Sequence, residues 1–180
     1  IFGARLADRL HSLWLASFHG GADADEAAPF VVVELGAGTG LLGFSLAAAG
    51  HSVTLTDRDG LDLLSATADK NAALIASRGG SVAIVQLDWE LIASPSDPLP
   101  AADILLGADI LYSSACVGPL LNTLVALIPV DNSTTRFFLC YKPREQEAEA
   151  AFFHALPAAG FSCCEKVHTS GEHSVFLIAR

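Results

Sequence analysis

A glycine-rich segment, Glu34-Leu35-Gly36-Ala37-Gly38-Thr39-Gly40-Leu41-Leu42-Gly43, determines the class of fold that the chain can adopt. An apolar, strand-like run over 30–35 leads into this segment, and a helical pattern over 39–49 follows it. In an open α/β sheet, the turn between the first strand and the first helix is where a nucleotide-like ligand binds. Glycines there let the backbone turn tightly and approach the ligand. Three glycines at alternate positions are more than an empty turn needs, so the segment predicts a ligand-binding loop.

Strand and helix patterns alternate along the rest of the chain. Strand patterns occur at 30–35, 52–56, 82–87, 103–108 and 136–141, and helical patterns at 39–49, 60–78, 114–128 and 144–156. Two further strands, 161–167 and 173–179, are joined by a link too short for a helical crossover, which predicts an antiparallel hairpin. The predicted fold is α/β: a doubly wound, Rossmann-like seven-stranded sheet, mostly parallel, with a C-terminal antiparallel hairpin.

Length and composition indicate one globular domain. The chain has 180 residues, of which 52% are hydrophobic, and its apolar runs are shorter than the roughly 20 residues that cross a membrane. We expect an N-terminal helix and loop over 1–29 and the ligand-binding domain over 30–180. The sequence contains no Met, even at position 1. We therefore expect that the natural start of the N-terminal segment is missing.

Charge and cysteine usage narrow the partners and the compartment. The formal net charge is −10, which disfavours binding to a nucleic-acid backbone and suits a basic protein or a small cation. Four cysteines, at 116, 140, 163 and 164, contain no Cys-x-x-Cys pair, so we expect free thiols and no disulfide framework or metal site. No secretory signal is visible. These features predict a protein of the cytoplasm or nucleus.

Glu34 indicates which ligand the loop binds. The spacing Gly38-x-Gly40-x-x-Gly43 formally matches a dinucleotide fingerprint. A carboxylate beside the loop would oppose a pyrophosphate, which depends on the positive end of the helix. S-adenosylmethionine has no phosphate, and its sulfonium and ammonium groups are attracted by carboxylates. The sequence therefore favours S-adenosylmethionine over NAD, and a methyltransferase over an oxidoreductase.

Acids also end the next three strands. Asp57, Asp88 and Asp109 follow the second, third and fourth strand patterns, and the carboxyl ends of parallel strands form the ligand edge of such a sheet. Asp57 is placed to accept hydrogen bonds from ribose hydroxyls, and Asp88 from an adenine amino group. Trp89 could pack against the adenine, although a half-exposed core position is as good an account. Any one of these acids could cap a turn or helix, but four in register favour a binding site.

These motifs resemble those of the seven-β-strand, non-SET protein lysine methyltransferases (the methyltransferase-16 group, methyltransferase-like 21 type). Residues 34–41 look like the first motif of that family, and Leu87-Asp88-Trp89 is similar to its adenine-side motif. The run Asp103 to Tyr112 resembles its fourth-strand motif, with Asp109-Ile110-Leu111-Tyr112 fitting Asp-x-x-Tyr, and 138–144 resembles the fifth strand and its sequel. The resemblance covers about 30–180.

The resemblance implies transfer of a methyl group from S-adenosylmethionine to a side chain of a protein substrate, most often lysine. It also implies a set of site residues. The expected catalytic residues are Asp109 and Tyr112, which would orient the amine. The expected cofactor-binding residues are Glu34, Gly36, Ala37, Gly38, Thr39, Gly40, Asp57, Asp88, Trp89 and Ala108.

The sequence leaves three alternative functions to consider. A methyltransferase acting on a small molecule or on RNA would keep the fold and the cofactor, but the acidic charge argues modestly against RNA. A relative without activity could keep the fold as a binding module. An NAD-dependent oxidoreductase is disfavoured by Glu34. The sequence identifies neither the protein substrate nor the oligomeric state.

Overall fold

The computed structural model of the chain describes residues 29–92, 99–132 and 134–180. Within these ranges the strands are β1 (Val31–Leu35), β2 (Ser52–Asp57), β3 (Ser81–Gln86), β4 (Ile104–Ala108), β5 (Arg136–Tyr141), β6 (Cys163–Ser170) and β7 (His173–Ala179). The α-helices are α2 (Leu41–Ala47), α3 (Leu61–Ser77), α4 (Val117–Leu127) and α5 (Gln146–Ala155), and short 3₁₀ turns are η2 (Trp89–Leu91) and η3 (Ser114–Cys116). The helix predicted near the N-terminus lies outside the described residues.

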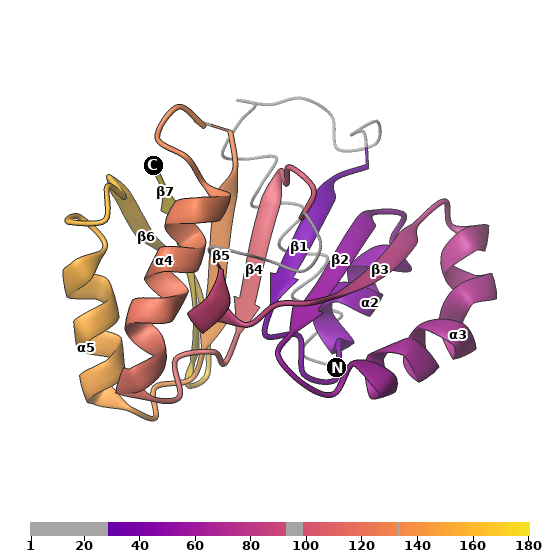
Figure 1. The fold of residues 1–180 in the computed structure, drawn as a ribbon, viewed down its shortest axis with the longest axis horizontal. Helices are drawn as coiled ribbons and strands as arrows, with labels where there is room; N and C mark the ends of the chain where they lie inside the picture. The colour runs from indigo at the N-terminus through magenta and orange to yellow at the C-terminus, as the bar shows by residue number, and fades with distance from the viewer. Residues whose placement is uncertain (1–28, 93–98, 133) are drawn as a thin grey trace.

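The seven strands form one sheet in the order β3-β2-β1-β4-β5-β7-β6 (Figure 1). Strands β1 to β5 pair in parallel, whereas β7 pairs antiparallel with both β5 and β6. The prediction of a mostly parallel seven-stranded sheet with an antiparallel C-terminal hairpin is confirmed. None of the helices in the described ranges is long and apolar enough to cross a membrane.

The helices divide the hydrophobic core into two layers. Helices α2 and α3 cover one face of the sheet, where Leu46 and Leu64 pack in one cluster with Val32 of β1. Helices α4 and α5 cover the other face, where Leu124 and Phe152 pack in a second cluster. Successive side chains of β1 enter opposite clusters, because side chains of a strand point alternately to its two faces. This burial on both faces explains why the strands read as continuous apolar runs.

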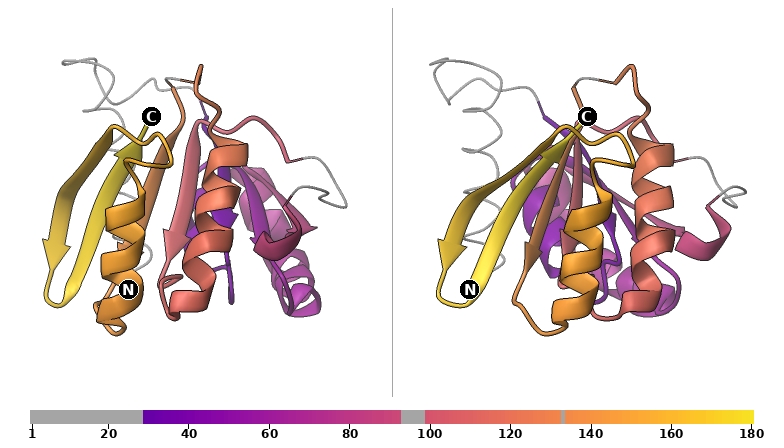
Figure 2. Two further views of the ribbon diagram at one scale, coloured as in Figure 1. Left: turned by 60° about the vertical axis from the view of Figure 1, so that its left-hand side comes forward. Right: turned by 90° about the vertical axis from the view of Figure 1, so that its left-hand side faces the viewer.

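The C-terminal hairpin is tighter than the sequence predicts. Strand β6 continues to Ser170, past the predicted end at 167, because the register shifts between Lys166 and His168 and pairing with β7 then resumes. Only Gly171 and Glu172 form the turn, and Gly171 has a positive φ of 59° that glycine adopts without strain. The turn lies at the same edge of the molecule as the carboxyl ends of β4 and β5 (Figure 2).

Gly43 brings α2 close to the sheet. A Cβ atom at this position would overlap Leu55 Cδ2 of β2 and would lie 2.5 Å from Glu34 Oε2. The absence of a side chain therefore lets the first helix pack directly on β1 and β2. This close packing determines where the loop between β1 and α2 can run.

We expect Gly43→Ala to lower the free energy of unfolding by about 1–3 kcal/mol, because the added methyl group would overlap the buried side chains of Leu55 and Glu34. Urea denaturation measures this change. Gly118→Ala is the matched control: Gly118 lies in α4, and a Cβ there meets no atom within 4 Å. It should leave stability unchanged or raise it by up to about 1 kcal/mol. Equal stability of the two variants would contradict the packing argument.

Candidate active site

A cavity of about 390 Å³ opens at the carboxyl ends of β1 to β4. This volume lies within the range of small-molecule sites in proteins. The structure brings seven of the twelve predicted site residues into its wall: Gly36, Asp57, Asp88, Trp89, Ala108, Asp109 and Tyr112. They come from four separate strand ends, as the predicted topology requires. The other five, Glu34, Ala37, Gly38, Thr39 and Gly40, build the loop and the strand behind the wall.

Backbone hydrogen bonds, one to β2 and one within the loop, hold the glycine loop in place. The N–H of Ala37 donates to the carbonyl of Thr56 at 2.8 Å, and the N–H of Gly40 donates to the carbonyl of Ala37 at 2.7 Å. Gly36, Gly38 and Gly40 all have a positive φ. Because Gly40 takes this left-handed conformation, α2 begins at Leu41 and not at the predicted residue 39.

Gly36 lets the wall of the cavity close around the loop. A Cβ atom at Gly36 would lie 3.0 Å from Ile110 Cγ2 and 3.4 Å from the Trp89 ring. The glycine therefore leaves its backbone exposed between two apolar side chains. This arrangement is what close approach of a ligand to a loop backbone needs.

Glu34 is buried, and its placement corrects the role that the sequence predicts for its charge. The side chain is 2% exposed and accepts a hydrogen bond from the N–H of Gly43 at 2.8 Å. It joins β1 to α2 and is absent from the wall of the cavity. Burial raises the pKa of the carboxyl from 4.5 to about 7, so it is not a fixed negative charge near neutral pH. The charge argument against a pyrophosphate must therefore rest on other acids.

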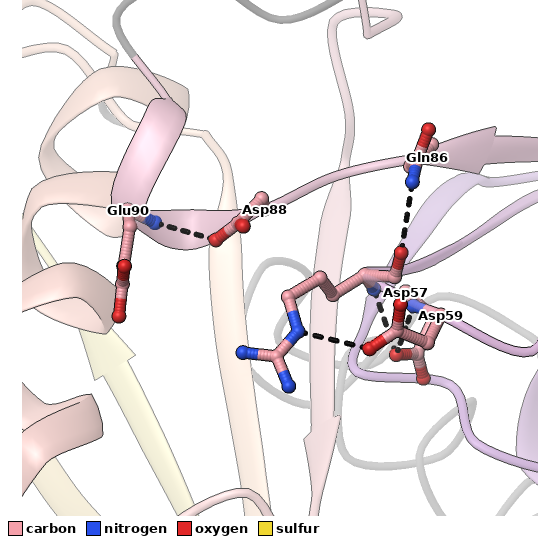
Figure 3. A network of polar contacts seen from close by, with 6 residues as sticks. Asp57, Asp59, Gln86, Asp88 and Glu90 are labelled. Carbon is pink, nitrogen blue, oxygen red and sulfur yellow. Dashed lines mark hydrogen bonds and ion pairs between the residues drawn. The ribbon is translucent and has the colours of Figure 1, made fainter.

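Those other acids lie at and just after the carboxyl ends of β2 and β3 (Figure 3). Asp57 lines the cavity, and its Oδ2 accepts from the N–H of Gly38 at 2.8 Å while its Oδ1 accepts from the N–H of Arg58 at 2.7 Å. Asp57 thus fixes the glycine loop from the neighbouring strand. Asp59 also lines the cavity and pairs with Arg58 at 3.0 Å. The hydrogen bond that the Arg58 guanidinium donates to Asp59 is the first cause that raises the pKa of Arg58, so Arg58 stays charged.

Asp88 caps a turn and also lies at the cavity. Its Oδ1 accepts from the N–H of Glu90 at 2.9 Å and so caps η2. The same residue lines the cavity, beside Trp89. A cap on this short turn fixes the direction in which the chain leaves β3, and it places the Trp89 ring against the glycine loop.

Asp109 and Tyr112 form the wall after β4. Asp109 has a left-handed backbone with φ 56°, the one positive φ among the described residues other than glycine. Its carboxylate accepts from the N–H of Lys142 at 3.1 Å and from Arg144 Nη2 at 3.0 Å. Tyr112 is 66% exposed, so it lies at the surface of this wall and not in the core. Both predicted catalytic residues thus face the same cavity as the glycine loop.

Sequence reasoning missed several residues of the cavity wall. Arg58 and Asp59 directly follow Asp57, the predicted acid of β2. Their position after a strand that ends at the ligand-binding edge could therefore have indicated that they line the cavity. Cys116 and Pro119 come from η3 and α4 and carried no such signal. In the described ranges, no three His, Cys, Asp or Glu side chains lie together as a metal site would require.

Burial of Glu34 makes stability depend on pH. The pKa is raised first by desolvation; the Gly43 hydrogen bond lowers it and the charge of Asp57 raises it. Between pH 4.5 and about 7 the folded chain keeps a proton that the unfolded chain has released. The free energy of unfolding therefore falls as pH rises through this window, and the loss is complete above it.

Glu34→Gln keeps an acceptor oxygen for Gly43 and has no proton to lose. We expect its stability relative to the unmodified chain to rise by roughly 3 kcal/mol from about pH 4 to about pH 8. Urea denaturation at stepped pH measures the difference between the two proteins. A difference that stays constant with pH would refute the assignment of this titration to Glu34.

Comparison with known proteins agrees with this geometry. A family model described as lysine methyltransferase matches residues 7–159. Protein N-lysine methyltransferase METTL21A of Danio rerio is 40% identical over 96 residues, which are 52% of this chain and 42% of that protein. EEF1A lysine methyltransferase 3 of Xenopus tropicalis is 32% identical over 152 residues, 83% of this chain and 63% of that protein. The chain thus spans less than two thirds of the length of either relative.

Among solved structures, magnesium protoporphyrin IX methyltransferase of Synechocystis PCC 6803 with bound SAM has a TM-score of 0.61 and 15% identity. The match covers 98% of this chain and 79% of that one, and it concerns the fold alone. The family match, in contrast, spans most of the chain and includes the glycine loop and all of the acids that line the cavity. The resemblance seen in the motifs is therefore confirmed: the chain belongs to the lysine methyltransferase family.

Proposed function

We propose that the chain is an S-adenosylmethionine-dependent methyltransferase that methylates a lysine side chain of a protein. The observation that carries this proposal is the cavity. In a chain of the lysine methyltransferase family, it places the glycine loop, three strand-end acids and the Asp-x-x-Tyr element around one space.

The residues around the cavity fit S-adenosylmethionine. Asp57 Oδ1 accepts from the N–H groups of Arg58 and Asp59, whereas Oδ2 accepts from that of Gly38. The second lone pair of Oδ2 can therefore accept from a ribose hydroxyl. Asp88 and Trp89 would contact the adenine, and the backbone at Gly36 can lie against the ligand. Asp57, Asp59 and Asp88 all line the cavity, so a ligand with cationic groups fits better than a pyrophosphate. These acids replace Glu34 as the reason to prefer this cofactor to NAD.

Asp109 and Tyr112 would receive the substrate amine. When bound, S-adenosylmethionine supplies a methyl group activated by a sulfonium. The lysine nitrogen must approach the methyl carbon to about 3–3.5 Å, in line with the breaking bond. Carboxylate and phenol oxygens on the wall after β4 can orient the amine by hydrogen bonds. A lysine, with a reference pKa of about 10.4, first releases its proton to water.

The partner and the compartment follow from the same proposal. The family implies a protein substrate, and the acidic chain suits a basic one. The free thiols of Cys116 and Cys140 support placement in the cytoplasm or nucleus.

Calorimetric titration tests the cofactor. We expect S-adenosylmethionine and S-adenosylhomocysteine to bind and NAD not to bind. Asp57→Asn should raise both Kd values roughly 10- to 100-fold, because a charged acceptor is lost. Asp69→Asn, on the exposed part of α3, makes the same charge change away from the cavity and should leave the Kd values unaltered. Binding of NAD alone would refute the proposal.

Transfer of tritiated methyl groups to proteins of a heat-treated cell lysate tests the reaction. We expect labelled methyl-lysine, and about a 10- to 100-fold slower reaction for Asp109→Asn and for Tyr112→Phe, because the amine is then misoriented. Cofactor affinity should stay within a few-fold of that of the unmodified chain. Label found only in small molecules or RNA would place the chain in the alternative class. Cofactor binding without any transfer would indicate a binding module.

A further inference from the structure

We propose that Arg144 is a positioning residue for the methyl-transfer reaction, because it holds the Asp109 carboxylate in the wall of the cavity. This inference rests on the proposed function. Arg144 follows β5 and does not itself line the cavity. Its Nη2 lies 3.0 Å from Asp109 Oδ2, so it can influence the reaction only through Asp109.

Asp109 is held from the β5 side at three points. Its own N–H donates to the carbonyl of Cys140 at 2.8 Å, which fixes the backbone. The N–H of Lys142 donates to Oδ1, and Arg144 donates to Oδ2. Both carboxylate oxygens are therefore engaged by one short loop. Asp tolerates the left-handed backbone at φ 56° better than most residues, yet this conformation still needs support from its surroundings.

Arg144 is placed in turn by α5. Its N–H donates to Glu149 Oε1 at 3.0 Å. The pKa of Tyr141 is raised to about 12, first by burial and then by the charge and hydrogen bond of Glu149. The Glu149 carboxylate that accepts from the loop after β5 thus also influences the hydroxyl of the last residue of β5. This connected set of contacts runs from α5 through Arg144 to the wall of the cavity.

The arrangement suits a neutral amine. Two of the roughly four lone-pair sites of the Asp109 carboxylate are used by the loop, and the others remain for a donor in the cavity. The Arg144 cation also balances the Asp109 charge, so that the carboxylate accepts a hydrogen bond without strongly attracting a second cation. The nucleophile is the neutral amine, so this balance favours the reactive form.

The groups that face Asp109 support the same reading. The Cys140 thiol stays neutral, because burial raises its pKa to about 11. Among the described residues, the charged and titratable groups near Asp109 include Arg144 and Cys140 in contact with it, Glu149 behind Arg144, and Lys142, whose ammonium pairs with Glu172. The cavity wall that Asp109 shares also holds Asp57, Arg58, Asp59, Asp88, Glu90, Tyr112 and Cys116. Arg144 is thus the cation that pairs directly with this carboxylate.

Arg144→Met removes the charge and the donor and keeps the length of the side chain. The Arg144 and Asp109 side chains are 62% and 43% exposed, so their ion pair contributes little to folding and the variant should stay folded. Arg144→Lys restores a cation. Arg78→Met is the matched control, since Arg78 is an exposed arginine at the end of α3, away from the cavity.

The first readout is geometric and needs no substrate. Hydrogen exchange followed by NMR should show the Lys142 amide exchanging about tenfold faster in Arg144→Met, because the carboxylate that it bonds is no longer fixed. The Asp109 amide, bonded to the backbone of Cys140, should keep its rate. Arg144→Lys should recover most of the protection. Unchanged exchange in Arg144→Met overturns the inference, whatever the activity.

The second readout is the rate of tritiated methyl transfer to the lysate proteins, against lysate concentration and pH. We expect kcat of Arg144→Met to fall about tenfold near pH 7.5 and by less than about threefold near pH 9.5, where more of the amine is neutral. The apparent KM should not rise, and the Kd for S-adenosylmethionine should not change. Arg144→Lys should regain most of the rate.

The outcomes separate the two proposals. A chain that binds S-adenosylmethionine but transfers no methyl group to protein refutes the proposed function, and the amide exchange still decides whether Arg144 orders Asp109. A chain that methylates protein while Arg144→Met matches Arg78→Met at every pH refutes only the positioning role. A loss of rate in Arg144→Met that is equal at all pH values refutes the preference for the neutral amine.

Discussion

The hydrogen bond from the N–H of Gly43 to the buried Glu34 carboxylate joins the first helix to the first strand. The glycine loop lies between these two ends, so its path is fixed once they are joined. A helix that could not approach β1 so closely would carry Gly40 and its neighbours away from β2. The contact between Gly38 and Asp57, which belongs to β2, depends on this approach. The glycine-loop side of the cavity wall is therefore placed relative to one buried acid.

Much of this arrangement could be predicted from sequence, for physical reasons that are general. Parallel strands end at one edge, so acids that follow β2, β3 and β4 had to meet there. The side chain of Glu34 could not be placed in this way, because its direction depends on how closely α2 packs, and that depends on Gly43 meeting Leu55. The charge of an acid is readable from sequence, whereas its burial and its pKa arise only in the folded chain.

The residues that contact the predicted catalytic pair could not be predicted from the sequence either. The motif identifies Asp109 and Tyr112, but Arg144 lies 35 residues beyond Asp109 in the chain. Only the parallel pairing of β4 with β5 brings them together. Among the described residues, three cations near this edge each pair with an acid: Arg58 with Asp59, Lys142 with Glu172 and Arg144 with Asp109. The net negative charge of the whole chain gives no sign of these local pairs.

The two-residue turn between β6 and β7 has a consequence for how such chains diversify. It lies at the edge where the cavity opens, and its Glu172 pairs with Lys142 of the loop that holds Asp109. The pairing of β6 with β7 runs along both strands and does not depend on the length of the turn. Residues inserted in the turn would therefore add surface beside the site without disturbing the sheet. Substrate range could therefore change by lengthening one hairpin, while the sheet and the cofactor loop stay constant.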